Sequence, residues 1–394
     1  MKRTAIKPRT RRRHPDARKV APPKAHQGQH VHKVHTVHSV NKVHAPVQPQ
    51  ITARFATGAW LLTCREGSER DLCDELLLRR WQQRAQAIAP ALVVVAGPPQ
   101  NGSPARELTF ARQGFKIALI SHVDSVEPAA RQLAALLQRA TGYALQVWTP
   151  DSSAGNALSA EARSLENALG SALAAALPQV PIWTATALPG QVGGRLVQAC
   201  LLSDQRVALG IDSAANAISL APGGRNRVHV PGPLPSRSAR KLEEALQWFG
   251  TAPGKGELCV DLGAAPGGWT YVLCGHGAKV IAVDPGALRD DIAAHRAVIH
   301  KRQNAFQFEP EETCDWLFCD MAYRPLEVAA LLAKWGRNRW ARLLVANIKL
   351  PMTKKAEIVM RVKEILEAGA GWKNVRAKQL YHDRDEVTLC GYVT

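Results

Sequence analysis

Four charged side chains in the C-terminal half of the chain could act together on a hydroxyl group. They are Lys241, Asp320, Lys349 and Glu386. A hydroxyl is a poor nucleophile at neutral pH, so it needs a base within hydrogen-bond distance. A lysine can be that base only when burial or a second cation, such as Lys241, lowers its pKa. The two carboxylates would orient the amines and the hydroxyl. A single lysine is more often a surface charge, but the set of four favours chemistry.

The elements that must position these side chains follow an alternating strand and helix pattern. Apolar runs, separated by helical segments, lie at 258–262, 279–284, 316–320, 343–348 and 387–393. This alternation predicts an α/β domain with a doubly wound, mainly parallel sheet. The C-terminal ends of parallel strands share one edge of a sheet. We therefore expect Asp320 and Lys349 to converge there.

The first of these runs leads into a loop of small residues, GAAPGG, at 263–268. Glycines let a ligand approach the backbone closely, and the first strand–helix turn of such a fold holds nucleotide-like cofactors. Asp284, at the end of the next run, is placed to accept both hydroxyls of a ribose. The loop lacks the G-x-G-x-x-G spacing of a pyrophosphate site. It resembles the loop with which S-adenosyl-L-methionine-dependent methyltransferases seat the methionine moiety.

The end of the run at 316–320 indicates which atom accepts a methyl group. Methylation of an exocyclic base amine usually uses an Asp/Asn-Pro-Pro-aromatic turn, and methylation of pyrimidine carbon 5 needs a cysteine in a Pro-Cys turn. The segment DWLFCDMAY (315–323) contains neither, and we expect Cys319 to lie in the core. Base methylation is therefore disfavoured, which leaves a ribose hydroxyl.

The four charged residues match the Lys-Asp-Lys-Glu tetrad of RNA ribose 2′-O-methyltransferases. The neighbouring strings resemble more closely the RlmM family, whose bacterial members methylate a cytidine ribose in 23S rRNA. The resemblance is dense over 236–394 and patchier over 58–220, for example in CREGSERDLC and FARQ. Its strings in the dense part are SRSARKLEE, DLGAAPGGWTY, CDM, NIKLPM and LYHDRDEVT.

The resemblance implies the roles of particular residues. Lys349 takes the proton-acceptor position, and transfer would be direct, with no metal and no covalent intermediate. Asn304 stands where the family usually has Asp near the adenine, and Asn can still accept from an adenine amine. The resemblance and the loop analysis together predict nine residues that bind S-adenosyl-L-methionine. They are Ser238, Gly263, Ala265, Pro266, Gly267, Gly268, Asp284, Asn304 and Asp320.

Composition divides the chain into four segments. The net charge is +18, of which residues 1–52 carry +11 together with seven histidines. We expect 1–52 to be a disordered basic tail that contacts nucleic acid, although a solubilising leader is an alternative. Residues 53–125 and 126–228 both have an α+β pattern. We expect a ferredoxin-like unit at 53–125, and the resemblance implies a THUMP-type RNA-binding unit at 126–228. We expect residues 229–394 to form the methyltransferase domain, whose start lies within a Gly/Pro-rich linker at 221–235.

The remaining features concern location and partners. The eight scattered cysteines form no CxxC pair and indicate reduced thiols in a cytoplasmic protein. No apolar run is long enough to span a membrane, and no secretory signal is recognised. We expect large-subunit rRNA as partner, naked or in an early precursor, and a monomer or weak homodimer. Two alternatives stay open: 2′-O-methylation of another RNA such as tRNA, and a non-catalytic ribosome assembly factor that binds S-adenosyl-L-methionine.

Overall fold

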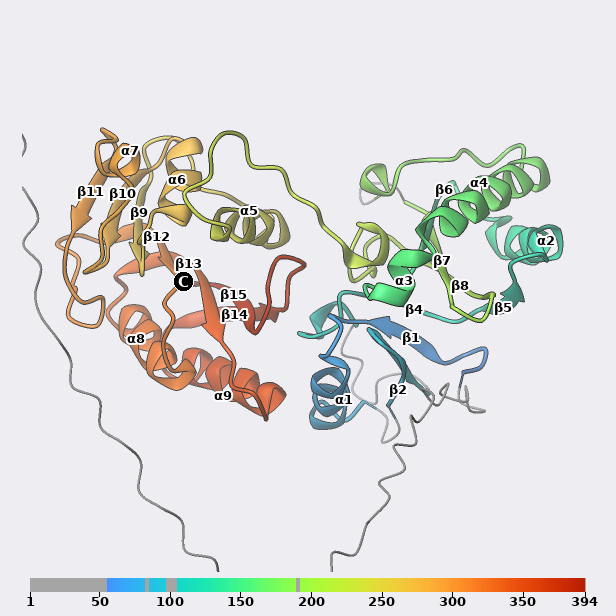
Figure 1. Ribbon diagram of the computed structural model, residues 1–394, viewed down its shortest axis with the longest axis horizontal. Coiled ribbons are helices and arrows are strands. Elements are labelled where there is room, and N and C mark those ends of the chain that lie inside the picture. Colours follow the sequence, from blue (N-terminus) through green and yellow to red (C-terminus); the bar gives the residue numbers. More distant parts are fainter. Residues whose placement is uncertain (1–54, 82–84, 97–104, 189–191, 394) are drawn as a thin grey trace, which may run out of the picture. The chain divides into compact units, whose positions relative to one another are not determined.

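The computed structural model describes residues 55–81, 85–96, 105–188 and 192–393 (Figure 1). The predicted basic tail therefore lies outside the described residues. Three β-sheets are formed by the part of the chain that is described. Two four-stranded sheets come first in the sequence, and a seven-stranded sheet follows the linker.

The first sheet is antiparallel and packs against one helix, α1 (Glu69–Leu78). The sequence pattern predicts a helix from about Ser68 to Arg84, which is wrong for residues 79–81, whereas 82–84 lie outside the described residues. The chain leaves the helix at Arg80, whose φ is +53°, and buries Trp81 edge-on against Trp60. Across the sheet the strands are β2 (Gln86–Ala89), β3 (Leu92–Val95), β1 (Trp60–Thr63) and β4 (Gln113–Lys116).

The second sheet is mixed, because β6 and β7 are parallel whereas β7 and β8 form an antiparallel hairpin, as the apolar runs at 196–202 and 207–211 predict. Its strands, in order, are β5 (Leu119–His122), β8 (Arg206–Ser213), β7 (Gly194–Leu201) and β6 (Gly142–Trp148). The amphipathic helices α2 (Val126–Leu137) and α4 (Ser159–Ala176) share one core with this sheet, and the short helix α3 (Ser153–Ala157) precedes α4. Because β5 precedes residue 126, this sheet contains strands from both sides of the predicted domain boundary at 125/126. The boundary stays a prediction.

The third sheet confirms the predicted doubly wound α/β fold. Five strands are parallel, and β15 then runs antiparallel to both β13 and β14. The order is β11 (Val298–Lys301), β10 (Lys279–Val283), β9 (Leu258–Leu262), β12 (Cys314–Cys319), β13 (Ala341–Lys349), β15 (Glu386–Val393) and β14 (Trp372–Lys378). The apolar runs predict five of these strands but miss β11 and β14, whose sequences are short or rich in charge.

Helices cover both faces of this sheet (Figure 1). One face packs against α8 (Pro325–Arg337) and α9 (Lys355–Glu367). The other packs against α5 (Ser238–Phe249) and α6 (Gly268–Gly275), with the one-turn α7 (Asp290–Ala293) beside them. Within the described residues, no helix combines the length and apolarity required to cross a bilayer.

Polar contacts join the segment after α1 to the end of β14. The buried Lys378 donates to Leu108 O at 3.1 Å. Arg112, also buried, donates to the carbonyls of Leu380 and Tyr381 at 3.0 and 3.2 Å. The loop between β14 and β15, which leads directly to Glu386, is therefore fixed on its N-terminal side.

Candidate active site

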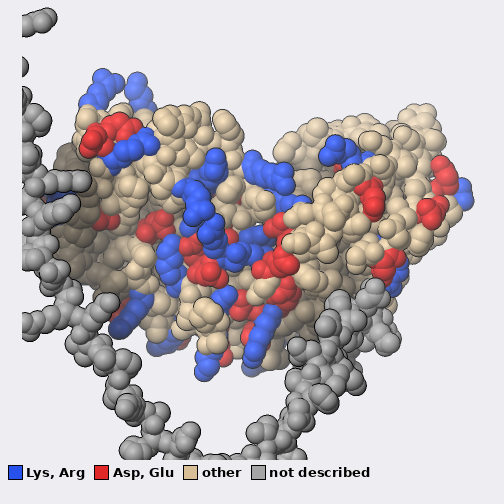
Figure 2. All heavy atoms as spheres, in the orientation of Figure 1, with Lys and Arg blue, Asp and Glu red and all other residues tan. Residues whose placement is uncertain are grey.

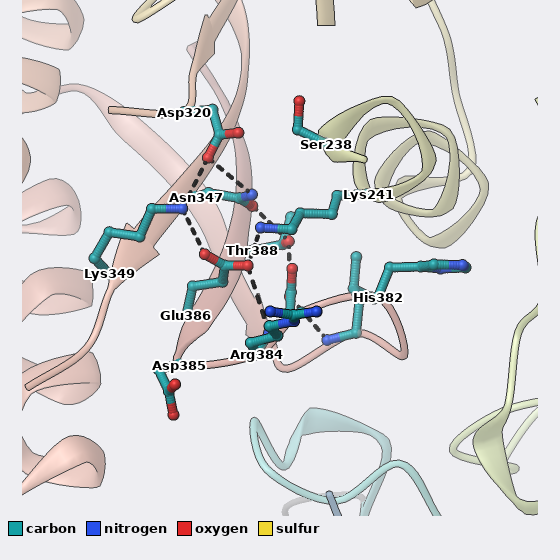
Figure 3. Close-up of polar contacts among 12 residues, drawn as sticks. Ser238, Lys241, Asp320, Asn347, Lys349, His382, Arg384, Asp385, Glu386 and Thr388 are labelled. Atoms are coloured by element: carbon teal, nitrogen blue, oxygen red, sulfur yellow. Dashed lines mark hydrogen bonds and ion pairs between the residues drawn. The ribbon is translucent and has the colours of Figure 1, made fainter. Parts of the chain in front are cut away.

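The structure brings the four charged residues of the sequence analysis into one cluster (Figure 3). Lys349 ends β13 and Glu386 begins β15, and the two are directly opposed across the antiparallel pair. Asp320 follows the last residue of β12, the parallel neighbour of β13. Lys241 reaches the cluster from the first turn of α5. Strand order and register therefore account for a site assembled from residues as far apart as 241 and 386.

Glu386 joins the two amines. Its Oε1 accepts from Lys241 Nζ, and its Oε2 accepts from Lys349 Nζ at 2.5 Å. The Lys349 amine also donates to Asp320 Oδ1 at 3.1 Å. The Glu386 side chain is only 7% exposed, whereas that of Lys349 is 30% exposed. The Lys349 side chain is thus the more accessible of this pair.

The electrostatics of the cluster differ from the sequence prediction in one respect. Burial alone would lower the pKa of Lys349, but the carboxylates of Asp320 and Glu386 outweigh it and raise that pKa above its usual value. For Glu386, burial would raise the pKa, and the two lysines reverse this and lower it. The prediction that a second cation lowers the pKa of the base is therefore wrong for the protein alone, because each amine faces a carboxylate.

The glycine loop after β9 is the predicted cradle for the cofactor. Gly263 has φ +80°, and a Cβ there would lie 2.9 Å from Met321 Cγ. Gly267, at φ +110°, caps α6, and a Cβ on Gly268 would lie 2.1 and 2.4 Å from the hydroxyls of Ser236 and Ser238. Neighbouring protein atoms therefore leave no room for a side chain at Gly263 and Gly268, and a backbone without Cβ atoms is what close approach of a cofactor requires.

The other residues predicted to hold the cofactor surround this loop. Asp284, after β10, accepts from Ala265 N at 3.1 Å and from Gly286 N at 2.7 Å. These bonds attach the acid to the loop, next to Pro266, which follows a cis peptide bond. Ser238 begins α5. Asn304 is exposed, and its Oδ1 accepts from Phe306 N at 2.9 Å, so its place in a cofactor site stays a prediction.

These residues fit S-adenosyl-L-methionine by their chemistry. The glycine cradle admits a small ligand against the backbone, and a carboxylate stands at the end of the second strand, where nucleosides bind in doubly wound folds. Asp320 links the cradle to the charged cluster, because its N–H donates to Leu262 O beside Gly263 while its side chain accepts from Lys349. A cofactor in the cradle and an acceptor hydroxyl near Lys349 would therefore be neighbours.

Sequence reasoning missed several buried polar groups behind the site. Asn347, Thr388 and Asp383 form hydrogen bonds that end on Asp320. Glu244 accepts from the backbone N–H groups of Tyr381 and His382 and so holds the loop before Glu386. The two-residue period of a strand was the signal, since it places Asn347 beside Lys349 and Thr388 beside Glu386 on one face.

Comparison with known families gives a match at the same part of the chain. Residues 234–364 match the FtsJ-like methyltransferase family. That segment contains the glycine cradle together with Lys241, Asp320 and Lys349, whereas Glu386 lies beyond it.

Full-length relatives extend the match. The chain is 34% identical over 342 residues to "Ribosomal RNA large subunit methyltransferase M" of Halorhodospira halophila, covering 84% of this chain and 95% of the relative. It is 37% identical over 348 residues to the protein of the same name from Xanthomonas axonopodis pv. citri, with coverages of 84% and 97%. Among solved structures, the match with TrmN from Thermus thermophilus covers 85% of this chain and 100% of that chain. The two chains are 14% identical, with a TM-score of 0.33.

Proposed function

Because the chain belongs to the ribosomal RNA large subunit methyltransferase M family, we propose that it methylates the ribose 2′-oxygen of a cytidine in large-subunit (23S) ribosomal RNA. It is an enzyme, and S-adenosyl-L-methionine is its methyl donor. The observation that carries the choice of a ribose hydroxyl is the cluster of Lys241, Asp320, Lys349 and Glu386 beside the glycine cradle.

The residues of the cluster would divide the work between them. Lys349 is the proton acceptor in its neutral form, a minor form at neutral pH because its pKa is raised, and it receives the proton of the attacking 2′-hydroxyl at Nζ. Asp320 and Glu386 each hold this amine by a hydrogen bond, which directs its remaining position towards the substrate. Lys241 neutralises part of the charge on Glu386 and so limits how strongly that carboxylate holds Lys349 protonated.

The cofactor would occupy the cradle formed by 263–268. When bound, S-adenosyl-L-methionine supplies a methyl group on a cationic sulfonium, which a nucleophile can displace. Gly263, Gly267 and Gly268 would admit it against the backbone, and Asp284 would accept from its ribose hydroxyls. Asn304 would meet the adenine.

The RNA would be bound largely by the N-terminal region. We propose that the units 53–125 and 126–228, the second of them THUMP-type, grip structured RNA, and that the basic residues 1–52 add salt-dependent affinity. Figure 2 shows Lys and Arg side chains gathered over α5 and the neighbouring strand ends, with Asp and Glu among them. A positively charged surface of this kind supports binding to a phosphate backbone. The protein would act in the cytoplasm.

The test is methyl transfer from labelled S-adenosyl-L-methionine to unmodified large-subunit rRNA, followed by nucleoside mass spectrometry. We expect 2′-O-methylcytidine as the product. A base-methylated nucleoside would contradict the acceptor assignment. Transfer to tRNA but not to rRNA would reassign the substrate, and cofactor binding without transfer to either RNA would indicate an assembly factor.

A further inference from the structure

Three polar side chains stand directly behind the charged cluster, and the reaction described above leaves them without a role. Asn347 and Thr388 face one another across β13 and β15, two cross-strand pairs along from Lys349 and Glu386. Both are fully buried, and so is Asp383 in the loop before β15. Burying three polar groups costs free energy unless each is satisfied, so their hydrogen bonds must account for their presence.

The side chains form one continuous line, of which Figure 3 labels Thr388, Asn347 and Asp320. Asp383 Oδ2 lies 3.1 Å from Thr388 Oγ1, which lies 2.8 Å from Asn347 Oδ1. Asn347 Nδ2 then donates to Asp320 Oδ1 at 3.3 Å. That is the same oxygen that accepts from Lys349 Nζ. The line thus ends on the carboxylate atom that holds the proposed base.

The number of hydrogens sets the direction of this line. An ionised Asp320 can only accept, so the amide nitrogen of Asn347 must face it and the amide oxygen must face Thr388. The single hydroxyl hydrogen of Thr388 is then used on Asn347. The contact between Thr388 and Asp383 therefore needs its hydrogen from Asp383, which can supply one only as the neutral acid.

We propose that Thr388 and Asn347 are positioning residues, and that Asp383 as a neutral acid is the terminal donor of a directed hydrogen-bond line that holds Asp320 against Lys349. This rests on the proposed function of Lys349 as proton acceptor. With the line intact, Asp320 Oδ1 is fixed between two donors, and the Lys349 amine is fixed with it. Without it, the Asp320 carboxylate can rotate and Lys349 loses one of its two anchors.

The surroundings of Asp383 agree with a neutral acid. Burial, together with the negative charges of Glu386 and Glu244, raises the pKa of Asp383 to about 8. The hydrogen bond from Leu380 N–H and the charge of Lys241 act in the opposite direction and lower this pKa. Arg112 donates to the backbone carbonyl of Asp383 at 3.5 Å, and its positive charge also opposes the rise of the Asp383 pKa. When Asp383 ionises, it becomes an acceptor that competes with Asn347 for the Thr388 hydrogen. The line should therefore weaken as the pH rises through about 8.

The test compares Thr388→Val, which removes the hydroxyl at nearly constant volume, with Thr388→Ser, which keeps it. Thr63→Val is the matched control, because Thr63 is a buried strand threonine whose hydroxyl has no hydrogen-bond partner in the described structure. Single-turnover methyl transfer is measured from pH 6 to 9.5 with saturating cofactor and RNA. We expect Thr388→Val to be about tenfold slower at pH 7, with an unchanged Kd for S-adenosyl-L-methionine. Thr388→Ser should recover most of the rate.

The pH profile separates positioning from a general loss of structure. The wild-type rate should rise with pH and bend near pH 8, and Thr388→Val should lose this bend. An equal rate for Thr388→Val and the wild type, a parallel loss of cofactor affinity, or a persisting bend would overturn the proposal.

A second readout needs no turnover. Carbon-13 NMR of the aspartate carboxyls, with Asp383 identified by its loss in Asp383→Asn, should show that carboxyl titrating near pH 8. An Asp383 already ionised at pH 6 would refute the directed line. If the wild type transfers no methyl group to RNA while Asp383 titrates near pH 8, the proposed function fails and the hydrogen-bond line stands.

Discussion

Glu386 is the nearer of the two carboxylates that raise the pKa of the proposed base, Lys349. Its Oε2 lies 2.5 Å from Lys349 Nζ, and its side chain is 7% exposed, so water screens the pair little. Glu386→Gln keeps the shape of the side chain and removes the charge. The amine then retains Asp320 as its anionic partner, while Lys241 loses the carboxylate that neutralises it.

The size of the effect follows from this geometry. An opposite charge within about 4–6 Å changes a pKa by about 1 to 3 units. Removing one of the two carboxylates should therefore lower the pKa of Lys349 by about 1 to 3 units. At a fixed pH below that pKa, the neutral fraction of the amine then rises by about tenfold per unit.

Competitive labelling with an amine-reactive reagent from pH 7 to 11, read by peptide mass spectrometry, measures this pKa for Lys349 itself. Lys354, whose side chain is 74% exposed, serves as the internal reference. The variant should show the inflection of Lys349 at least one pH unit below that of the wild type. Coincident inflections would refute the reasoning that Glu386 sets the protonation of the amine.

Three further predictions concern the fold, the cradle and the tail. Burial lowers the pKa of Lys378 to about 7, so the unfolded chain binds one more proton than the folded one between about pH 7 and 10 and stability rises with pH there. Lys378→Met should reduce that slope of the unfolding free energy, in denaturant titrations, by up to about 1.4 kcal/mol per pH unit, and an unchanged slope would contradict the burial argument. Gly267→Ala places a side chain at φ +110°, which costs about 1–3 kcal/mol of strain. If the loop relaxes, calorimetry should show roughly 5- to 150-fold weaker cofactor binding, whereas wild-type affinity would mean that the loop is not the cradle. Removing residues 1–52 should flatten the salt dependence of RNA affinity by about 0.7 per lost phosphate contact, and an unchanged slope would make the segment a leader.

The sequence predicted those parts of the fold where local pattern and tertiary environment agree. Strand β9 has the predicted bounds, 258–262, because it is a mostly apolar run that is buried on both faces. The strand β14 was missed because its sequence, WKNVRAK, is mostly polar and is interrupted by a bulge between Lys373 and Arg376. Helix α1 ends early because burial of Trp81 outweighs helical continuation.

For the candidate site, residue types were predictable and their interactions were not. The convergence of Asp320 and Lys349 follows from the shared edge of parallel strands. The opposition of Lys349 and Glu386 needed the antiparallel register of β15, which no local pattern specifies. The direction of the Lys349 pKa was predicted wrongly, because it depends on the distances to two carboxylates.

The most direct test of the central claim compares the wild type with Lys349→Ala in single-turnover transfer to large-subunit rRNA, with the Kd for S-adenosyl-L-methionine measured on both. Loss of a general base should slow transfer by about 10²- to 10⁴-fold. The Kd should stay within about twofold, because the hydrogen bonds of Lys349 go to Asp320 and Glu386 and not to the glycine cradle. Slow transfer at unchanged cofactor affinity is the predicted result. A variant that transfers at the wild-type rate, or that loses cofactor binding in proportion to its rate, would contradict the account.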